Sequence, residues 1–375
     1  MFNILVDGRV WSRNAAGITT FLKGVLMEWA RQRTDDKFLV LLPKGMDNTV
    51  ELPPIPDNIQ LLDYSRRFPR RLPNIIILQC LVPWLCRVRH IDIYYTPLSH
   101  LPFGIPSRVK TVVTVHDVVN IEMSHTMSWT NKLANKYCFG RAVRKADILW
   151  ANSNYTRSKI DSYFPDRSCR QVFVGDAADR SLFYPRTLSE AQRSAVRDRY
   201  GIRQRFLLFV GTLEPRKNLK FLLSIIPKLY VEHGIQLVVV GGRGWKNSDV
   251  KTIVDHPDFP KDSTIFCGYI TNAELADLYC TADCFVSAAL MEGFGMPQLE
   301  ALMCGCPVVT ADNTAMTEIA TGKDGAFLVE GYQPEKWQSV ILQVLAEHPA
   351  VNQRQLADYD WQTILHRFIT MNYEL

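Results

Sequence analysis

The segment from Glu292 to Glu300 places two carboxylates eight positions apart, with two glycines and a proline between them. Pro297 suits the first position of a helix, where its missing N–H has no consequence, so we expect a loop over 292–296 and Glu300 in the first helical turn. The amino end of a helix attracts phosphate, and carboxylates accept hydrogen bonds from sugar or ribose hydroxyls. A ligand that carries both groups is a nucleotide sugar. The alternative is a structural turn, since glycine-rich turns precede many helices in α/β proteins.

The chain has 375 residues, of which 47% are hydrophobic and 22% are charged, with a net charge of +5. These values are ordinary for a soluble globular protein and argue against disorder or a fibrous fold. Since a single core rarely grows beyond about 250–300 residues, the length predicts two domains. The net charge is too small and too scattered to indicate nucleic acid as a partner.

The nine cysteines are an odd number spread over a long chain, without a C-x-x-C pair or histidines at zinc spacing. We expect them to be reduced and packed in the core. The chain begins with an apolar strand rather than a basic leader, so secretion is not expected. The longest apolar run, 75–86, contains Gln79 and Pro83 and is too short to span a bilayer. These features predict a cytoplasmic protein.

Predicted strands and helices alternate through both halves of the chain. The strands expected in the first half are 3–6, 38–42, 91–95, 110–115, 148–151 and 171–174. Those expected in the second half are 206–210, 237–240, 264–267, 284–286, 307–310 and 326–329. Helical periodicity marks 20–33, 132–144, 218–230, 272–280, 297–303 and 335–347. Continuous apolar strands suit parallel sheets buried on both faces, so we predict two doubly wound halves joined by the polar stretch 183–197.

In doubly wound sheets, ligands bind beyond the carboxyl ends of the strands. The residues at these positions are mostly glycines, carboxylates or a histidine, which makes them candidates for a binding site. They are Asp7-Gly8, His116-Asp117, Gly211-Thr212, Gly241-Gly242, Gly268-Tyr269 and Glu292.

Several segments, in their order and spacing, resemble the retaining glycosyltransferases of the GT-B fold. The similarity is to the large family four, which includes bacterial polysaccharide mannosyl-, glucosyl- and galactosyltransferases. The resemblance is carried by 209–218, 268–270, 275–279 and 292–309, and more loosely by 113–117 and 151–155.

This resemblance implies an α/β protein with two doubly wound, Rossmann-like domains that face a central cleft. Residues 1–190 would form the acceptor-side domain and 191–355 the nucleotide-sugar-binding domain. Residues 356–375 would form a C-terminal helix that packs back towards the N-terminal domain.

By the same resemblance, Arg216 and Lys217 grip the donor diphosphate, where negative charge grows as the glycosidic bond breaks. Glu300 would accept hydrogen bonds from the ribose hydroxyls. Glu292 would face the transferred sugar and balance oxocarbenium charge. Without the resemblance, Arg216 and Lys217 could be two solvated cations at a helix start. That alternative is weakened because cations are disfavoured at the amino end of a helix unless an anion is bound.

The resemblance also implies contacts made largely by the backbone. Tyr269 and Ile270 would seat the base of the donor, and Gly17 corresponds to an amino-terminal glycine loop near the phosphates. Ala16 replaces the commoner second glycine of that loop. The donor-binding residues implied after strands of the second half are Gly211, Phe294, Gly295 and Met296. Ala288 and Ala289 stand where many members have Pro-Ser, which bears on the sugar preference rather than on the reaction class.

His116 follows a predicted strand and matches the active-site histidine that contacts the donor sugar in this family. The alternative is a structural role, which is commoner for a lone histidine.

The sequence shows no Ser-His-Asp order and no nucleophile elbow. Front-face attack by the acceptor, assisted by the leaving phosphate as base, requires positioning and charge stabilisation instead. The one tight carboxylate pair that resembles a metal motif is Asp358 and Asp360, and Asp360 precedes a helical pattern that begins at Trp361. We therefore interpret Asp360 as a helix N-cap and expect no metal.

Arginines flank the apolar run 75–86, and a basic, apolar helix can lie on an anionic membrane. The alternative is an ordinary amphipathic helix packed on the first domain, with its arginines in solvent. The neighbouring apolar stretch 123–129 could instead line an acceptor cleft. The flanking arginines are Arg66, Arg67, Arg70 and Arg71 before the run and Arg87 and Arg89 after it.

The sequence thus predicts a cytoplasmic, retaining glycosyltransferase that uses a GDP- or UDP-linked sugar, with GDP-mannose as the leading donor by resemblance. The expected acceptor is a glycan or lipid-linked oligosaccharide of surface polysaccharide assembly, such as O-antigen, with peripheral contact at the inner face of the membrane. The alternatives are a nucleotide-sugar epimerase of the same shape and a non-catalytic nucleotide-sugar-binding protein. An NAD oxidoreductase is disfavoured, because Asp7-Gly8-Arg9 stands where G-x-G-x-x-G would follow the first strand.

Overall fold

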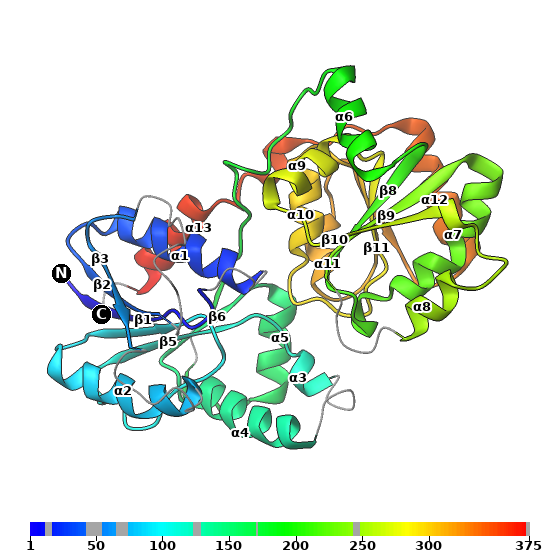
Figure 1. The fold of residues 1–375 in the computed structure, drawn as a ribbon. Helices are drawn as coiled ribbons and strands as arrows, with labels where there is room; N and C mark the ends of the chain where they lie inside the picture. Colours follow the sequence, from blue (N-terminus) through cyan, green and yellow to red (C-terminus); the bar gives the residue numbers. More distant parts are fainter. Residues whose placement is uncertain are drawn as a thin grey trace. The chain divides into compact units, whose positions relative to one another are not determined.

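The computed structural model describes residues 1–11, 17–42, 55–64, 74–122, 129–169, 172–242 and 248–372. The chain forms two compact units (Figure 1), one made of Met1–Ala177 with Tyr359–Leu375 and the other of Ala178–Asp358. Within the described ranges, no helix is both long and apolar enough to cross a membrane. Two predicted features lie outside the described residues. One is most of the apolar stretch 123–129, and the other is the basic group of Arg66, Arg67, Arg70 and Arg71.

A parallel sheet of seven strands forms the centre of the first unit, in the order β3-β2-β1-β4-β5-β6-β7. The six strands predicted for this half are confirmed. The additional strand, β3, lies at the edge of the sheet, and every one of its residues is at least partly exposed. It therefore lacks the continuous apolar run that marks its neighbours. The strands are β1 (Asn3–Asp7), β2 (Lys37–Leu42), β3 (Ile59–Asp63), β4 (Ile93–Thr96), β5 (Lys110–Val115), β6 (Ile148–Ala151) and β7 (Val172–Val174).

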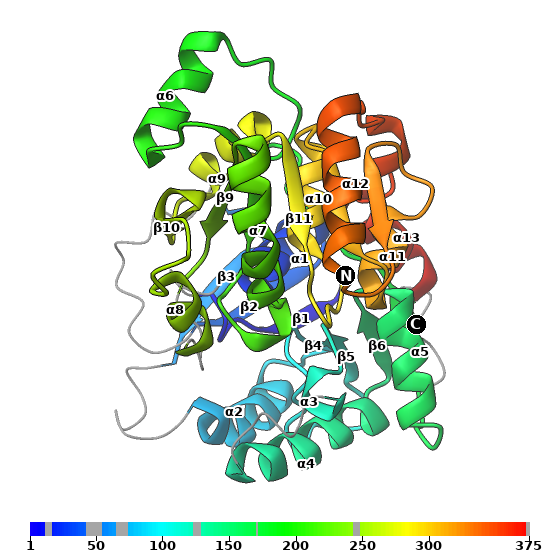
Figure 2. The same cartoon turned by 90° about the vertical axis from the view of Figure 1, so that its right-hand side faces the viewer.

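Different helices cover the two faces of this sheet (Figures 1 and 2). Because successive side chains of a strand point to opposite faces, Ile4 and Val6 pack in one core and Leu5 in the other. The core around Ile4 and Val6 includes α1 and α13, and the core around Leu5 includes α2 and α4. The helices are α1 (Ile18–Gln32), α2 (Asn74–Val88), α3 (Val119–Glu122), α4 (Trp129–Lys145), α5 (Asn154–Tyr163) and α13 (Trp361–Asn372).

The last helix, α13, packs tightly against α1. Gly24 of α1 makes this approach possible, since a Cβ atom there would lie 2.2 Å from Nε1 of Trp361. Asp360 caps the helix as the sequence predicts, with Oδ2 accepting the N–H of Thr363 at 3.3 Å. Phe368 stacks on Trp150 of β6, with ring centroids 4.6 Å apart. The end of the chain therefore completes the core of the first unit.

The second unit is built on a parallel sheet of six strands in the order β10-β9-β8-β11-β12-β13. All six strands predicted for this half are confirmed. The central strand β9 is fully buried along its length, as a strand covered on both faces should be. The strands are β8 (Arg205–Val210), β9 (Ile235–Val240), β10 (Thr264–Gly268), β11 (Cys284–Ser287), β12 (Val308–Ala311) and β13 (Ala326–Val329).

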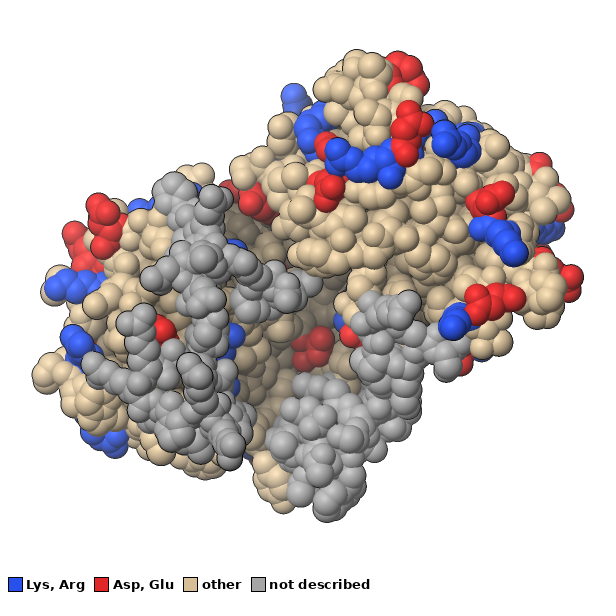
Figure 3. Space-filling model, viewed as in Figure 1, with Lys and Arg blue, Asp and Glu red and all other residues tan. Residues whose placement is uncertain are grey.

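Helices follow most strands of the second unit, and one further helix precedes the sheet. This helix, α6, begins within the polar stretch that is predicted to join the two halves. Ser189 and Gln192 form a capping box, and none of the helical residues is buried. Basic and acidic side chains lie together over α6 in Figure 3. The helices are α6 (Glu190–Tyr200), α7 (Leu219–His233), α8 (Ser248–Val254), α9 (Asn272–Thr281), α10 (Met296–Met303), α11 (Thr314–Ala320) and α12 (Pro334–Glu347).

All nine cysteines are free thiols. The expectation that they pack in the core is wrong for Cys80, which is exposed on α2. Three more are only half-buried. The five buried thiols are Cys86, Cys169, Cys284, Cys304 and Cys306.

Candidate functional site

The loop between β11 and α10 presents the two glutamates identified in the sequence. Gly295 caps α10 with a left-handed φ of 104°, so the helix begins at Met296 and Pro297 is its second residue. Proline is tolerated there because the N–H groups of the first turn lack intrahelical acceptors. The expected position of Glu300 in the first turn is wrong, since it is the fifth residue of the helix.

Glu292 lies in a buried cluster with Arg216 and Lys217. Its Oε2 accepts a hydrogen bond from Nη1 of Arg216 at 3.1 Å, and its Oε1 pairs with Nζ of Lys217. Only 9% of Glu292 and 8% of Lys217 is exposed. Burial raises the pKa of the Glu292 carboxyl, but the charges of Lys217 and Arg216 outweigh it and lower this pKa below its ordinary value. The carboxylate is therefore ionised, and the alternative of two solvated cations is excluded for Lys217.

Neighbouring strands bring these residues together although they are far apart in the sequence. β8 and β11 pair in the sheet, and the loops that follow them meet at its carboxyl edge. The N–H of Leu290 donates to the carbonyl of Arg216 at 2.7 Å, which ties the two loops. Gly211 leaves room for the aliphatic part of Lys217, because a Cβ atom there would lie 3.3 Å from Cε of Lys217. Arg216 and Lys217 occupy a short 3₁₀ turn, Pro215–Lys217, ahead of α7.

Glu300 has a different environment from Glu292. Its Oε2 accepts a hydrogen bond from the hydroxyl of Tyr279 on α9 at 3.1 Å. Burial raises the pKa of the Glu300 carboxyl to about 8, and the Tyr279 hydrogen bond and the charge of Lys217 oppose this shift only in part. The carboxyl is thus largely protonated at neutral pH in the ligand-free protein.

Three residues that were not predicted from the sequence, Asn313, Thr314 and Tyr332, hold the backbone of the loop between β11 and α10. Thr314 adopts a left-handed φ of 53°, and its Oγ1 accepts the N–H of Glu292 at 3.3 Å. A β-branched residue in this region is strained by about 1–3 kcal/mol, which is typical of functional sites. Asn313 donates from Nδ2 to the carbonyl of Ala289 at 3.0 Å, and the Tyr332 hydroxyl donates to the same carbonyl at 3.0 Å. The position of Asn313 just after β12 is the sequence signal that would have found this set.

The remaining predicted residues of the second unit divide into two groups. Lys217, Glu292 and Gly295 line one small hollow together with Ser287 and Gln298. Phe294, which precedes Gly295 in the sequence, is buried, and Met296 is partly exposed. Tyr269 and Ile270 follow β10 outside this hollow, and the side chain of Tyr269 is exposed.

His116 follows β5 in the first unit, and hydrogen bonds engage both ring nitrogens. Nε2 lies 2.8 Å from the carbonyl of Pro97, and Nδ1 lies 2.9 Å from Nδ2 of Asn152. These partners fit a neutral ring with the proton on Nε2, since the carbonyl can only accept and the amide nitrogen can only donate. Burial lowers the pKa of His116 to about 4, although the hydrogen bond to Pro97 acts in the opposite direction. His116 is therefore neutral at physiological pH.

Two other positions at the carboxyl edge of the first sheet are polar or glycine. Gly17 caps α1 with a φ of 62°, and Ala16 lies outside the described residues. Asp7 ends β1 as a buried carboxylate and pairs with Arg9, whose Nη2 lies 2.7 Å from Oδ2. Arg9 in turn lies 3.4 Å from Nδ1 of His100. Burial and the charge of Arg9 lower the pKa of His100 to about 4.

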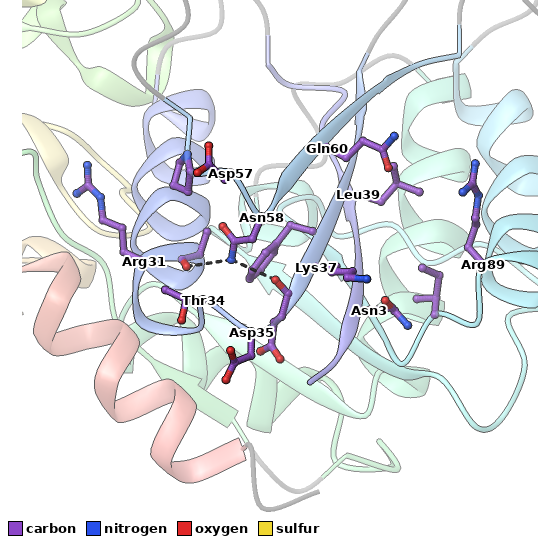
Figure 4. A pocket seen from close by; sticks show the side chains of 15 residues that line it. Asn3, Arg31, Thr34, Asp35, Lys37, Leu39, Asp57, Asn58, Gln60 and Arg89 are labelled. Atoms are coloured by element: carbon purple, nitrogen blue, oxygen red, sulfur yellow. Dashed lines mark hydrogen bonds between the residues drawn. The ribbon is translucent and has the colours of Figure 1, made fainter.

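A hollow of about 930 Å³ lies away from these residues (Figure 4). It is formed at the amino ends of β1 and β2, the edge opposite to the one where ligands bind in such sheets. Asn58 in its wall uses its amide to donate to the carbonyls of Ala30, Arg33 and Asp36, each at 3.1 Å. We interpret it as a structural hollow.

Among the described residues, no group of three or more histidine, cysteine or carboxylate side chains is placed to hold a metal ion. The described part of the site offers arginine, lysine and backbone N–H groups as its sources of positive charge.

Comparison with known proteins gives a consistent family. Residues 204–347 match the family described as Glycosyl transferases group 1. The chain is 27% identical over 273 residues to O-antigen chain mannosyltransferase B of Escherichia coli, which covers 68% of this chain and 69% of the relative. It is 24% identical over 251 residues to the serotype-specific mannosyltransferase WbdA of Escherichia coli, covering 64% of this chain but only 29% of that longer protein.

The solved structure of Anabaena Alr3699/HepE, in complex with UDP and glucose, matches the whole of both chains with a TM-score of 0.74 at 18% identity. At that identity the likeness shows the fold, which is the GT-B fold predicted from the sequence. Residues 204–347 belong to the glycosyl transferases group 1 family, and the chain is a glycosyltransferase.

Proposed function

We propose that the chain transfers mannose from GDP-mannose to a glycan or lipid-linked acceptor in the assembly of a surface polysaccharide such as O-antigen. The names of the two Escherichia coli relatives support mannose as the sugar. The Anabaena neighbour binds UDP and glucose, which makes a UDP-linked sugar the competing donor.

The observation that carries the proposal is the cluster of Arg216, Lys217 and Glu292. Both cations contact the buried carboxylate of Glu292, and Nε of Arg216 also pairs with Oε2 of Glu214 at 2.8 Å, so the charges of the cluster balance. A diphosphate would satisfy both cations and release Glu292 to accept hydrogen bonds from sugar hydroxyls. As the glycosidic bond breaks, charge grows on the phosphate oxygens, and cations already fixed in place stabilise it without reorganising.

The other donor contacts follow from the elements that surround the cluster. We assign the ribose hydroxyls to Glu300, and the base to Tyr269 and Ile270. The amino end of α10 directs backbone N–H groups towards the place proposed for phosphate or sugar. The residues assigned to this backbone contact are Phe294, Gly295 and Met296, with Gly211 beside Lys217 and Gly17 at the amino end of α1.

We further propose that transfer retains the anomeric configuration and needs no metal ion. The leaving phosphate would act as base for the attacking hydroxyl, while Arg216 and Lys217 supply the positive charge that a metal supplies elsewhere. The second unit binds the nucleotide sugar and the first unit the acceptor, and the enzyme works in the cytoplasm at the inner face of the membrane. For His116 we propose a contact with the donor sugar, in which a sugar hydroxyl replaces Pro97 or Asn152 as the partner of one ring nitrogen.

The test is to incubate the full chain with a panel of GDP- and UDP-linked sugars, with and without lipid extract as acceptor, and with EDTA. We expect nucleotide release that depends on acceptor, is fastest with GDP-mannose, resists EDTA and gives an α-linked product by NMR. Conversion of a donor without acceptor would identify an epimerase instead. Donor binding without any turnover would identify a non-catalytic binding protein.

A further inference from the structure

The outer face of α2 is apolar along its described length. Ile76, Cys80, Trp84 and Val88 are spaced four residues apart, so they form one stripe on the helix surface. All four are exposed, and about half of each of the Ile76, Trp84 and Val88 side chains is open to solvent. The opposite face of the same helix packs in the core of the first unit. The stripe is therefore additional to the face that folding requires.

Two aromatic residues extend this stripe beyond α2. Phe103 is 65% exposed, and its N–H donates to Oε1 of Gln79 on α2 at 2.9 Å. The guanidinium of Arg141 on α4 lies 4.0 Å from the centre of the Phe103 ring. Tyr137, one turn before Arg141, is exposed as well. Because α2 and α4 lie side by side in both Figure 1 and Figure 2, we treat these residues as one surface, the α2–α4 apolar surface.

The charges around this surface are positive. α2 contains no aspartate or glutamate, and its one charged residue, Arg87, is exposed beside Val88. Arg89 follows and is also exposed. Arg87 donates to the carbonyl of Gly104 at 3.0 Å and so holds the turn that carries Phe103. Arg141 covers the other side of Phe103.

A soluble protein rarely exposes a continuous set of large apolar side chains unless they contact something. Tryptophan, tyrosine and phenylalanine beside arginine match the boundary of a bilayer, where rings enter the headgroup layer and cations meet anionic lipid. Aromatic residues and arginine are also enriched at protein–protein interfaces. The lack of any acidic residue in α2 favours an anionic bilayer over a protein partner.

We propose that the α2–α4 apolar surface docks on an anionic lipid bilayer, with Trp84 and Phe103 inserted and Arg87 and Arg89 on the headgroups. The inference rests on the proposed function only in that the acceptor would be carried by a membrane lipid. The docking is assigned to the α2–α4 apolar surface and does not depend on the arginines at 66–71.

The test measures flotation of the full chain with vesicles of phosphatidylcholine alone or mixed with phosphatidylglycerol. We expect binding to the mixed vesicles that weakens with salt. Trp84→Ser should lower vesicle affinity about tenfold or more. Arg87→Gln and Arg89→Gln, made as separate variants, should each lower it about fivefold. The matched controls are Val231→Ser and Arg203→Gln, which change an exposed apolar and an exposed basic residue of the second unit and should bind as the parent does.

Circular dichroism and thermal unfolding check each variant, and Phe103→Ser replaces Trp84→Ser if the latter does not fold. The proposal is overturned if the parent does not bind anionic vesicles, or if the Trp84 and Phe103 variants bind them with the same affinity as the parent. It is also overturned if sedimentation shows a parent dimer that Trp84→Ser dissociates, since a second copy would then cover the surface. Vesicle binding without any sugar transfer would refute the proposed function and leave this inference intact.

Discussion

The two units share one strand order and each carries an ion pair at the carboxyl edge of its sheet, Asp7–Arg9 in the first and Lys217–Glu292 in the second, but the edges differ in their other polar groups. In each unit the first strand along the chain, β1 or β8, is the third strand of the sheet. The next two strands lie on one side of it, and all later strands lie on the other side. After β8 and β11 the second unit gathers Arg216, Lys217 and Glu292 in a cluster of ion pairs. After β5 the first unit presents His116, whose ring is neutral and held by Pro97 and Asn152.

This difference shows how one scaffold supports two kinds of recognition. Buried cations aimed at a common point attract and stabilise an anion, and they act most strongly as its charge increases. The neutral imidazole of His116 instead makes directed hydrogen bonds, at present to Pro97 and Asn152, and its lowered pKa keeps it neutral at physiological pH. The predictions below test whether the two edges differ in this way.

The largest effect should come from Lys217→Ala, because it removes a charge that opposes the developing negative charge of the leaving group. Losing one such preorganised contact typically lowers turnover about a hundred- to thousandfold. Lys217→Arg should recover only part of this, since a forked guanidinium cannot replace an ammonium without moving its neighbours. Steady-state kinetics with varied donor measures the effect on kcat separately from KM.

The matched control for this variant is Lys220→Ala, which removes an exposed lysine of α7 and should leave the kinetics unchanged. Turnover of Lys217→Ala within about threefold of the parent would remove Lys217 from the diphosphate site.

The next largest effect should be on donor affinity in Glu300→Ala. The variant loses a charged acceptor for the ribose hydroxyls, which contribute similarly in the ground and transition states. A hydrogen bond to a charged group typically contributes about 1.5–3 kcal/mol, or roughly ten- to hundredfold in affinity. Calorimetric titration with nucleotide measures it, with the exposed Glu330→Ala as control. An unchanged dissociation constant would show that Glu300 lies outside the site.

A smaller effect should follow pH. Since burial raises the pKa of Glu300 to about 8, the free protein must lose a proton before this carboxyl can accept two hydrogen bonds. Nucleotide affinity should therefore rise by up to about tenfold per pH unit towards pH 8 and level off above it. The raised pKa also means that Glu300 favours folding at low pH, and that this stabilisation is lost as pH rises from the ordinary glutamate range to about 8. A pH-independent affinity in the parent, equal in shape to that of Glu300→Gln, would contradict the assignment.

The smallest effect concerns His116 of the first unit and the way in which kcat depends on pH. Since burial lowers the pKa of His116 to about 4, this histidine should not titrate where the enzyme works. His116→Gln should lower activity yet leave the shape of the kcat profile above about pH 5 unchanged. An inflection near the ordinary histidine pKa that disappears in His116→Gln would make the ring an acid or base rather than a neutral hydrogen-bonding group.

The sequence predicts the strands of both sheets because parallel strands buried on two faces leave continuous apolar runs. Among the elements that it misses, β3 and α6 share one physical reason. β3 is an exposed edge strand and α6 buries none of its residues, so neither has the apolar pattern that prediction uses. Both form through backbone pairing or capping instead.

The candidate site is predictable where a residue type follows a strand and less so where the backbone decides. Glu292 is predicted from its type and its place before a helix, and Arg216 and Lys217 from the resemblance to the family. The structure brings the three residues into contact. Thr314 was not, because no residue preference suggests a threonine with a left-handed φ. Glu300 lies one residue deeper in α10 than expected, since Gly295 rather than Met296 caps the helix.

The return of Tyr359–Leu375 to the first unit bears on the order in which the protein matures during synthesis. The whole second unit leaves the ribosome before α13 does, so it can fold while the first is still incomplete. Until α13 arrives, Trp150 and Gly24 lack the aromatic partners that complete their core, and one face of the first sheet remains apolar and open. The half of the enzyme that is translated first is therefore the last to finish folding, and a chain stopped short of Trp361 would carry that sticky face permanently.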